Sequence, residues 1–174
     1  EFIPVTPQGA VDLEALAKLL EGPKALVSVM LANNETGVIQ PIREIVALAQ
    51  AHGALVHTDA VQAFGKMPVN FGLLGVDMMT IAAHKIGGPT GIGALVVRDG
   101  LPLEPLVHGG GQELRRRAGT ENLVGIAGFA AVAKESQLDV KALQAQLEEA
   151  LADAVIFGGD APRLSNTTNF AHPG

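Results

Sequence analysis

Residues 54–85 read ALVHTDAVQAFGKMPVNFGLLGVDMMTIAAHK, and they carry the clearest indication of the fold class. It opens on an apolar run at Ala54–Thr58 and closes on a second apolar run at Asp77–Ala82. Runs of this length, rich in aliphatic residues and bounded by polar residues and glycines, are typical of strands. The connection between them is long enough for a crossover, so the two strands are predicted to be parallel.

The neighbouring segments extend the same pattern in both directions. Ala25–Leu31 is predicted to be a buried strand, and a helix is expected to begin near Pro41 and to end near Gly53. Ile92–Arg98 follows only a short glycine-rich turn, which cannot form a crossover, so this strand is predicted to be antiparallel to its predecessor. The fold class is therefore α/β, with a mainly parallel sheet and one antiparallel strand.

The last third of the chain differs in pattern. Glu121–Glu135 is apolar on most faces and is predicted to be a buried helix, whereas Lys141–Asp153 is more amphipathic. Two short runs, at Ala154–Phe157 and Asn169–Ala171, are predicted to begin strands of another unit. This pattern indicates the start of a smaller α+β domain.

We expect a domain boundary between residues 137 and 138, so that 1–137 belong to the larger domain and 138–174 to the smaller one. Glu1–Pro7 is interpreted as an edge strand. Because the sheet begins in mid-pattern and the second unit has few elements, we expect the chain to be a fragment of a longer protein.

Composition excludes several classes of function. The chain has 12 basic and 18 acidic residues, a net charge of −6, which argues against nucleic-acid or membrane partners. It has no cysteine, which excludes disulfides and thiolate metal sites, and its histidines show no metal-binding spacing. No signal peptide or membrane-spanning run is recognised, so a cytoplasmic protein without a bound metal is predicted.

Polar clusters follow three of the predicted strands. Asn34 lies after the first strand, Asp59 and Gln62 after the second, and His84 with Lys85 after the third. Because the carboxyl ends of parallel strands meet at one edge of a sheet, these side chains are expected to share a ligand crevice. Taken alone, Asp59 could merely cap the next helix, and Lys85 could be a solvated surface residue.

A lysine and a carboxylate at one rim match the needs of pyridoxal phosphate. The cofactor aldehyde is held by a lysine amine, here Lys85, and its pyridine nitrogen is kept protonated by an acid, here Asp59. Amide side chains can bond the phenolic oxygen of the ring, and a histidine, a hydroxyl and backbone N–H groups can bind the phosphate. The candidates for these further contacts are Gln62, Asn34, His84 and Thr120.

Four segments give the sequence a family resemblance. In order they read NNETGVIQPI, HTDAVQAFGK, AAHKIGGPTGIGAL and HGGGQELRRRAGTEN. In order and spacing they resemble the successive motifs of cysteine desulfurases, within the class V aminotransferase group of fold-type I pyridoxal-phosphate enzymes. The resemblance runs from Ala25 to the closing RLSNTTNF stretch.

This resemblance implies conversion of L-cysteine to L-alanine, with the sulfur passed to an enzyme cysteine as a persulfide. The sulfur would serve iron–sulfur cluster assembly or another sulfur-transfer pathway, through a sulfur-acceptor protein. A homodimer is implied as well. The resemblance implies that Lys85 attaches the cofactor and transfers protons, that Asp59 pairs with the pyridinium, and that Gln62 contacts the phenolic oxygen. It also implies that Asn34 lies beside the cofactor, that His84 binds its phosphate, and that Thr120 contacts the phosphate of a neighbouring subunit.

Departures from the family pattern limit what the chain can be expected to do alone. Ala82 stands where the family usually has a phosphate-binding serine. The family's catalytic cysteine and its substrate-binding arginine would follow this sequence, and its ring-stacking histidine would precede it, so the fragment is expected to be inactive alone. Two alternatives remain: another class V enzyme, such as a selenocysteine lyase or an aminotransferase, and a non-catalytic α/β binding module.

Overall fold

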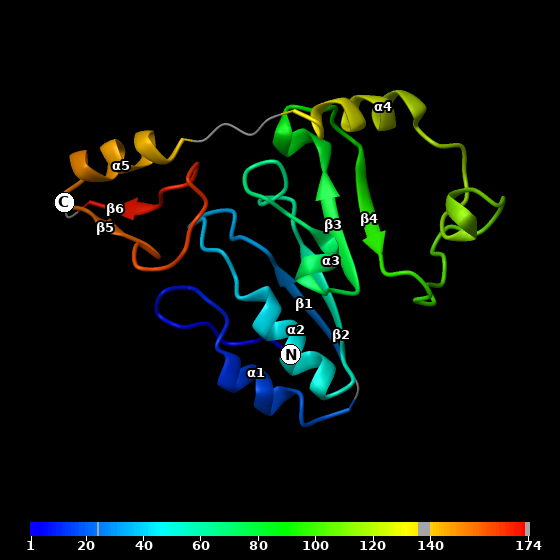
Figure 1. The fold of residues 1–174 in the computed structure, drawn as a ribbon, viewed down its shortest axis with the longest axis horizontal. Helices are drawn as coiled ribbons and strands as arrows, with labels where there is room; N and C mark the ends of the chain where they lie inside the picture. Colours follow the sequence, from blue (N-terminus) through cyan, green and yellow to red (C-terminus); the bar gives the residue numbers. More distant parts are fainter. Residues whose placement is uncertain (24, 136–139, 173–174) are drawn as a thin grey trace.

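The computed structural model shows a twisted sheet with helices around it and a small hairpin unit to one side (Figure 1). No helix in its described parts has both the length and the apolar character needed to cross a bilayer. The residues that the structure describes are 1–23, 25–135 and 140–172.

The sheet has four strands in the order β1-β2-β3-β4. β1 (Leu26–Met30), β2 (Leu55–Asp59) and β3 (Met78–Ala82) are parallel, and β4 (Gly93–Val97) is antiparallel to β3. The predicted α/β class and the predicted strand directions are therefore confirmed. The short turn before β4 leaves no room for a crossover, which is why its direction reverses.

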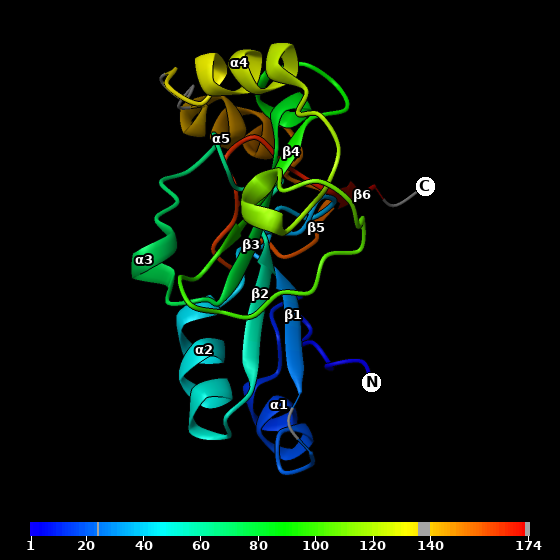
Figure 2. The ribbon, with the colours of Figure 1, turned by 90° about the vertical axis from the view of Figure 1, so that its right-hand side faces the viewer.

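One face of this sheet is covered by helices. α2 (Ile42–Ala51) begins directly after Pro41, as its fixed φ favours, and packs against β2. The short helix α3 (Phe71–Leu74) lies on the same side of the sheet as α2 (Figure 2). α1 (Leu13–Leu19) contacts α2 and is capped by Asp12, whose carboxylate accepts hydrogen bonds from two backbone N–H groups.

The two faces of the sheet differ in burial. Along β1 and β2 every second side chain is buried under the helices, because successive side chains point to opposite faces. The alternate side chains are exposed or half-buried on the other face, called the open face below. Ala25–Leu31 is predicted to be a buried strand, but it is buried on one face only. The covered face includes Val27, Val29, Val56, Thr58 and Met79, and the open face includes Ser28, Met30, His57, Asp59, Thr80 and Leu95.

Beyond β3 the chain forms a short 3-10 helix, η1 (Ala83–Ile86), and a second one, η2 (Glu113–Arg115), lies in the loop after β4. α4 (Leu123–Val132) crosses the end of the sheet where β3 stops and contacts η1 (Figure 1). The prediction that this helix is buried is wrong within the described chain, since Leu123 is 71% and Val124 84% exposed. Among the described residues, packing partners are found for one side of α4 only, although the helix is apolar all round.

The C-terminal unit consists of α5 (Lys141–Ala150) and a hairpin of β5 (Val155–Ile156) and β6 (Phe170–Ala171). Arg163 connects the loop between β5 and β6 to α5, because its guanidinium donates to both carboxylate oxygens of Glu148, at 2.8 and 2.9 Å. Backbone hydrogen bonds from this unit also reach the loop that follows β1. The expected domain boundary between 137 and 138 lies outside the described residues.

The N-terminal prediction fails. Glu1–Pro7 was interpreted as an edge strand, but the described structure has only an isolated bridge between Val5 and Val11 there. Pro4 and Pro7 have no backbone N–H to donate, so this segment can supply few hydrogen bonds to a ladder.

Candidate active site

The carboxyl ends of the three parallel strands lie at one rim of the sheet. Met30, Asp59 and Thr80 are register partners in adjacent strands, so they stand side by side at this rim. The turn that contains Asn34 follows β1, and η1, which contains Lys85, follows β3. The predicted site residues thus come from three neighbouring strand ends, where open α/β sheets bind ligands.

Asp59 is exposed on the open face, at the last position of β2. Its Oδ1 accepts a hydrogen bond from the backbone N–H of Val61 at 2.9 Å, so this carboxylate does cap the turn after β2. Its other oxygen has no hydrogen bond among the described residues. Capping and ligand binding are compatible here, because each uses a different oxygen.

The turn after β2 carries Gln62 and Lys66, both half-buried. The Lys66 Nζ donates a hydrogen bond to the Gln62 Oε1 at 2.7 Å. Sequence reasoning had assigned no role to Lys66. Only the four-residue spacing of the two side chains could have suggested the contact.

Lys85 is exposed within η1, which begins after Ala82 and ends at Gly87, a glycine in the left-handed region with φ of 84°. Lys85 and Lys66 line the same cavity, of about 370 Å³, together with Ser165 of the C-terminal unit. Burial, and then the nearby charge of Lys85, lower the pKa of Lys66. The cavity therefore brings two amines together.

The remaining predicted site residues are exposed, and no hydrogen bond or ion pair of the described structure joins their side chains to Lys85 or Asp59. Asn34 is exposed, and the side chain that holds its turn is that of Asn33, whose Oδ1 accepts from the backbone of Glu35 and Thr36. His84 is exposed beside Lys85, and Thr120 is exposed in the segment before α4. Among the described residues that line the cavity at Lys85 there is no other predicted site residue: Asn34, Asp59, Gln62, His84 and Thr120 all lie outside it. Within the described chain no hydrogen bond or ion pair joins Asp59 to Lys85.

A polar ladder, Ser28–His57–Thr80, crosses three strands on the open face. The Ser28 Oγ lies 2.8 Å from the His57 Nδ1, and the Thr80 Oγ1 lies 3.4 Å from the His57 Nε2. Burial lowers the pKa of His57, and the neighbouring Asp59 carboxylate partly opposes this by raising it. Strand alternation places His57 and Asp59 on one face and could have indicated this relationship from the sequence.

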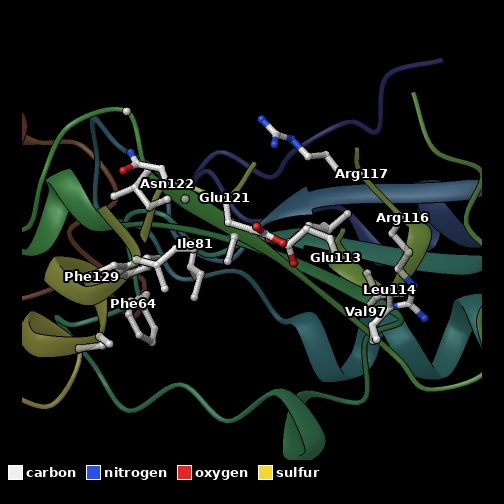
Figure 3. A pocket seen from close by; sticks show the side chains of 18 of the residues that line it. Phe64, Ile81, Val97, Glu113, Leu114, Arg116, Arg117, Glu121, Asn122 and Phe129 are labelled. Carbon is white, nitrogen blue, oxygen red and sulfur yellow. The ribbon is translucent and has the colours of Figure 1, made fainter. Parts of the chain in front are cut away.

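A larger cavity, of about 830 Å³, lies against β4 and α4. Figure 3 shows Phe64, Ile81 and Phe129 at one end of it and Leu114 and Arg116 at the other. The rings of Phe64 and Phe129 meet edge to face, with centroids 6.1 Å apart. None of the predicted site residues lines this cavity, so its size alone does not make it the active site.

No metal centre is formed by the part of the chain that the structure describes, in which three or more His, Asp or Glu side chains nowhere gather suitably. The groups at the strand rim are instead an amine, a carboxylate and an amide. Together they can form a covalent bond to a carbonyl, hold a proton on a ring nitrogen and donate to a ring oxygen.

Comparison with known proteins gives a consistent family match. The model of the family described as "Aminotransferase class-V" matches residues 1–156. "Cysteine desulfurase 2" of Trichormus variabilis is 45% identical, over 97% of this chain and 45% of its own length. "Cysteine desulfurase IscS" of Dictyoglomus turgidum is 40% identical, over 98% of this chain and 46% of its own length.

Solved structures agree. A NifS-like protein from Rickettsia africae is 41% identical with a TM-score of 0.92, covering 99% of this chain and 51% of its own. A structure described as "SspA in complex with cysteine" is 33% identical with a TM-score of 0.85, covering 99% of this chain and 50% of its own. The chain thus spans about half the length of the relatives it matches.

Proposed function

Since the chain belongs to the class V aminotransferase family, we propose that it is the cofactor-binding part of a pyridoxal-phosphate-dependent cysteine desulfurase. The proposed reaction converts L-cysteine to L-alanine and transfers the sulfur to a protein thiol as a persulfide. Two relatives named as cysteine desulfurases, and a solved relative holding cysteine, support this substrate. The sequence has no cysteine, so the accepting thiol lies outside these 174 residues.

The observation that carries the proposal is the placement of Asp59 and Lys85 at the ends of adjacent parallel strands. Asp59 keeps one carboxylate oxygen without a hydrogen bond in the described chain, and Lys85 is exposed beside a cavity. These groups fit pyridoxal phosphate, which needs a free amine for its aldehyde and an acid for its ring nitrogen.

Bound pyridoxal phosphate supplies an electron-withdrawing ring that stabilises negative charge at the substrate Cα. Lys85 provides the amine that attaches the cofactor and later moves a proton at that carbon. Asp59 keeps the ring nitrogen protonated through its free oxygen. Gln62 would donate from its amide N–H to the phenolic oxygen, and Asn34 would lie beside the ring.

Phosphate binding is assigned to His84, to backbone N–H groups and to Thr120, which we propose reaches the cofactor of a second subunit in a homodimer. Ala82 supports a weaker phosphate site, because it offers no side-chain hydroxyl at the start of η1. A separate sulfur-acceptor protein and a cytoplasmic location complete the proposal.

The test uses the full-length protein that carries this chain. The protein is loaded with pyridoxal phosphate and reduced with borohydride, and the labelled peptide is identified by mass spectrometry. We expect the label on Lys85, and loss of the visible cofactor absorbance and of alanine formation from L-cysteine in Lys85→Ala. Lys18→Ala, on the exposed side of α1, is the matched control and should behave as wild type.

Label on Lys66 in place of Lys85 would refute the assignment, and this outcome is a real alternative because both amines line one cavity. Absence of any label in the wild-type protein would instead favour a non-catalytic binding module. Labelling of Lys85 without alanine formation would favour another reaction of the same family.

A further inference from the structure

The turn after β2 is compact and places Gln62 and Lys66 one helical turn apart. The backbone N–H of Phe64 donates to the carbonyl of Ala60 at 2.8 Å, and that of Lys66 donates to Ala63 at 3.0 Å. The side chains then meet, and the Lys66 Nζ lies 2.7 Å from the Gln62 Oε1. This is a short hydrogen bond in a half-buried place.

The chemistry of this contact fixes the direction of the Gln62 amide. A charged lysine amine has three donors and no acceptor, so it can bond only the oxygen of a glutamine side chain. The two ends of an amide are otherwise nearly equal in shape and can exchange by rotation. While Lys66 holds the oxygen, the N–H₂ group of Gln62 must face away from Lys66.

The backbone next to Lys66 lies close to η1. The neighbouring Gly65 has a φ of 76° and lies against Ile86 of η1, so the turn after β2 approaches η1 closely. Lys66 and Lys85 consequently line one cavity, and the charge of Lys85 acts on Lys66. Lys66 is therefore next to both the amide and the amine of the proposed site.

We propose that Lys66 is a positioning residue that orients Gln62, so that its amide N–H faces the phenolic oxygen of the cofactor. The inference rests on the proposed function, in which that oxygen carries negative charge and needs a donor. With the amide reversed, a carbonyl oxygen would face the phenolic oxygen, and the contact would be repulsive. Lys66 removes this alternative without touching the cofactor.

The test compares the full-length, cofactor-loaded proteins carrying Lys66→Met, Gln62→Leu and both changes together. The readout is the pH midpoint at which the visible absorbance of the bound cofactor changes. Loss of a hydrogen bond to a charged oxygen should shift this midpoint by about one pH unit or more. We expect Lys66→Met and Gln62→Leu each to raise the midpoint. The midpoint of the double variant should lie only slightly above that of Gln62→Leu, and the difference should be much smaller than the shift caused by Lys66→Met alone.

Two further variants distinguish orientation of the Gln62 amide from a general effect of removing a positive charge. Lys66→Arg keeps the donors and should restore most of the wild-type midpoint, whereas Lys18→Met removes a distant charge and should leave it unchanged. Thermal unfolding of each variant shows whether it is folded. If Lys66→Met is unfolded, Lys66→Gln takes its place: a glutamine side chain has an acceptor as well as donors, so it cannot fix the direction of the Gln62 amide, and Lys66→Gln should raise the midpoint relative to Lys66→Arg.

Additive shifts in the double variant would overturn the proposal, because Lys66 would then act through its charge alone. An unchanged midpoint in Lys66→Met or in Gln62→Leu would overturn it as well. These failures differ from failure of the proposed function, in which the wild-type protein would show no lysine-bound cofactor absorbance at all.

Discussion

Gly65 and Ile86 approach so closely that a Cβ atom at position 65 would overlap the Cγ2 of Ile86. Gly65 also has a φ of 76°, in the left-handed region that other residues adopt with strain. This contact joins the turn after β2 to η1. It therefore brings the segment of Asp59 and Gln62 to the segment of Lys85.

Gly65→Ala should weaken cofactor binding as well as the fold. The left-handed backbone alone should cost about 1 kcal/mol, and the overlap with Ile86 should force η1 away from the turn. The free energy of unfolding is measured in urea and the cofactor affinity by absorbance titration. Gly100→Ala is the matched control, because its φ is 75° but no atom lies within 4 Å of the added Cβ. Equal losses of cofactor affinity in the two variants would contradict the importance of the Gly65–Ile86 contact.

Thr58 is fully buried, and its Oγ1 has no hydrogen-bond partner within the described parts of the chain. Thr58→Val removes this buried hydroxyl at nearly constant shape, so it should raise the free energy of unfolding by about 1 kcal/mol. Thr36→Val is the contrast, since the Thr36 hydroxyl donates to Asn33 and accepts from Val38, and its loss should destabilise. A destabilised Thr58→Val protein in urea unfolding would indicate a partner for this hydroxyl, such as a bound water.

The pair Arg163–Glu148 is expected to stabilise the C-terminal unit. The Arg163 side chain is only 8% exposed and that of Glu148 25%, so the Glu148 carboxylate left by removal of Arg163 is only partly hydrated. Arg163→Met should lower the free energy of unfolding by about 1–2 kcal/mol through loss of hydrogen bonds to a charged group. Arg43→Met, at an exposed position of α2, should change it little. Similar effects of the two substitutions would show that the buried pair is not stabilising.

The same pair predicts a dependence of stability on pH. Burial by itself would raise the pKa of Glu148, but hydrogen bonds from Arg163 and Thr168, with the Arg163 charge, outweigh burial and lower it. A carboxyl whose pKa is lowered on folding stabilises the protein above its unfolded pKa of 4.5, and this stabilisation is lost as pH falls below it.

The lowered pKa of His57 predicts a second pH range in which the stability of the fold changes. Its pKa is lowered by burial, against the opposing effect of Asp59, so the unfolded chain binds a proton at higher pH than the folded protein does. The free energy of unfolding should therefore fall as pH drops below about 6.5, the ordinary value. His57→Asn should flatten this slope between about pH 7 and pH 5. An unaltered slope in His57→Asn would refute the assignment.

Much of the sheet could be predicted from sequence because its signals are local. Ala54–Thr58 and Asp77–Ala82 are short apolar runs ended by polar residues, and the structure places β2 and β3 there to within one residue. The direction of β4 followed from the length of one turn. α1 was not predicted, although Asp12 is a typical cap before it.

Burial was predicted less well because it depends on what covers each element. Ala25–Leu31 and α4 have the composition of buried segments, but the described chain covers only one side of each. Composition reports that a segment can be buried and cannot report which side has a partner.

The site was predictable at the level of strand ends only. Asp59 and Lys85 were expected at one rim because parallel strands end together, and their strands are adjacent in the sheet. Their individual roles stay predictions. The contacts of Lys66 with Gln62, and of His57 with Ser28 and Thr80, depend on side-chain directions that no spacing in one sequence determines.

The alternation of buried and more exposed side chains along β2 also favours its native register with β1. If β2 slid by one residue along β1, its side chains would exchange faces, because their period is two. His57 and Asp59 would enter the apolar layer beneath α2, and an unpaired carboxylate there would cost several kcal/mol. The shifted register would therefore be much less stable than the native one. The same polar side chains that lie at the rim of the sheet thus also favour the native register of β1 and β2.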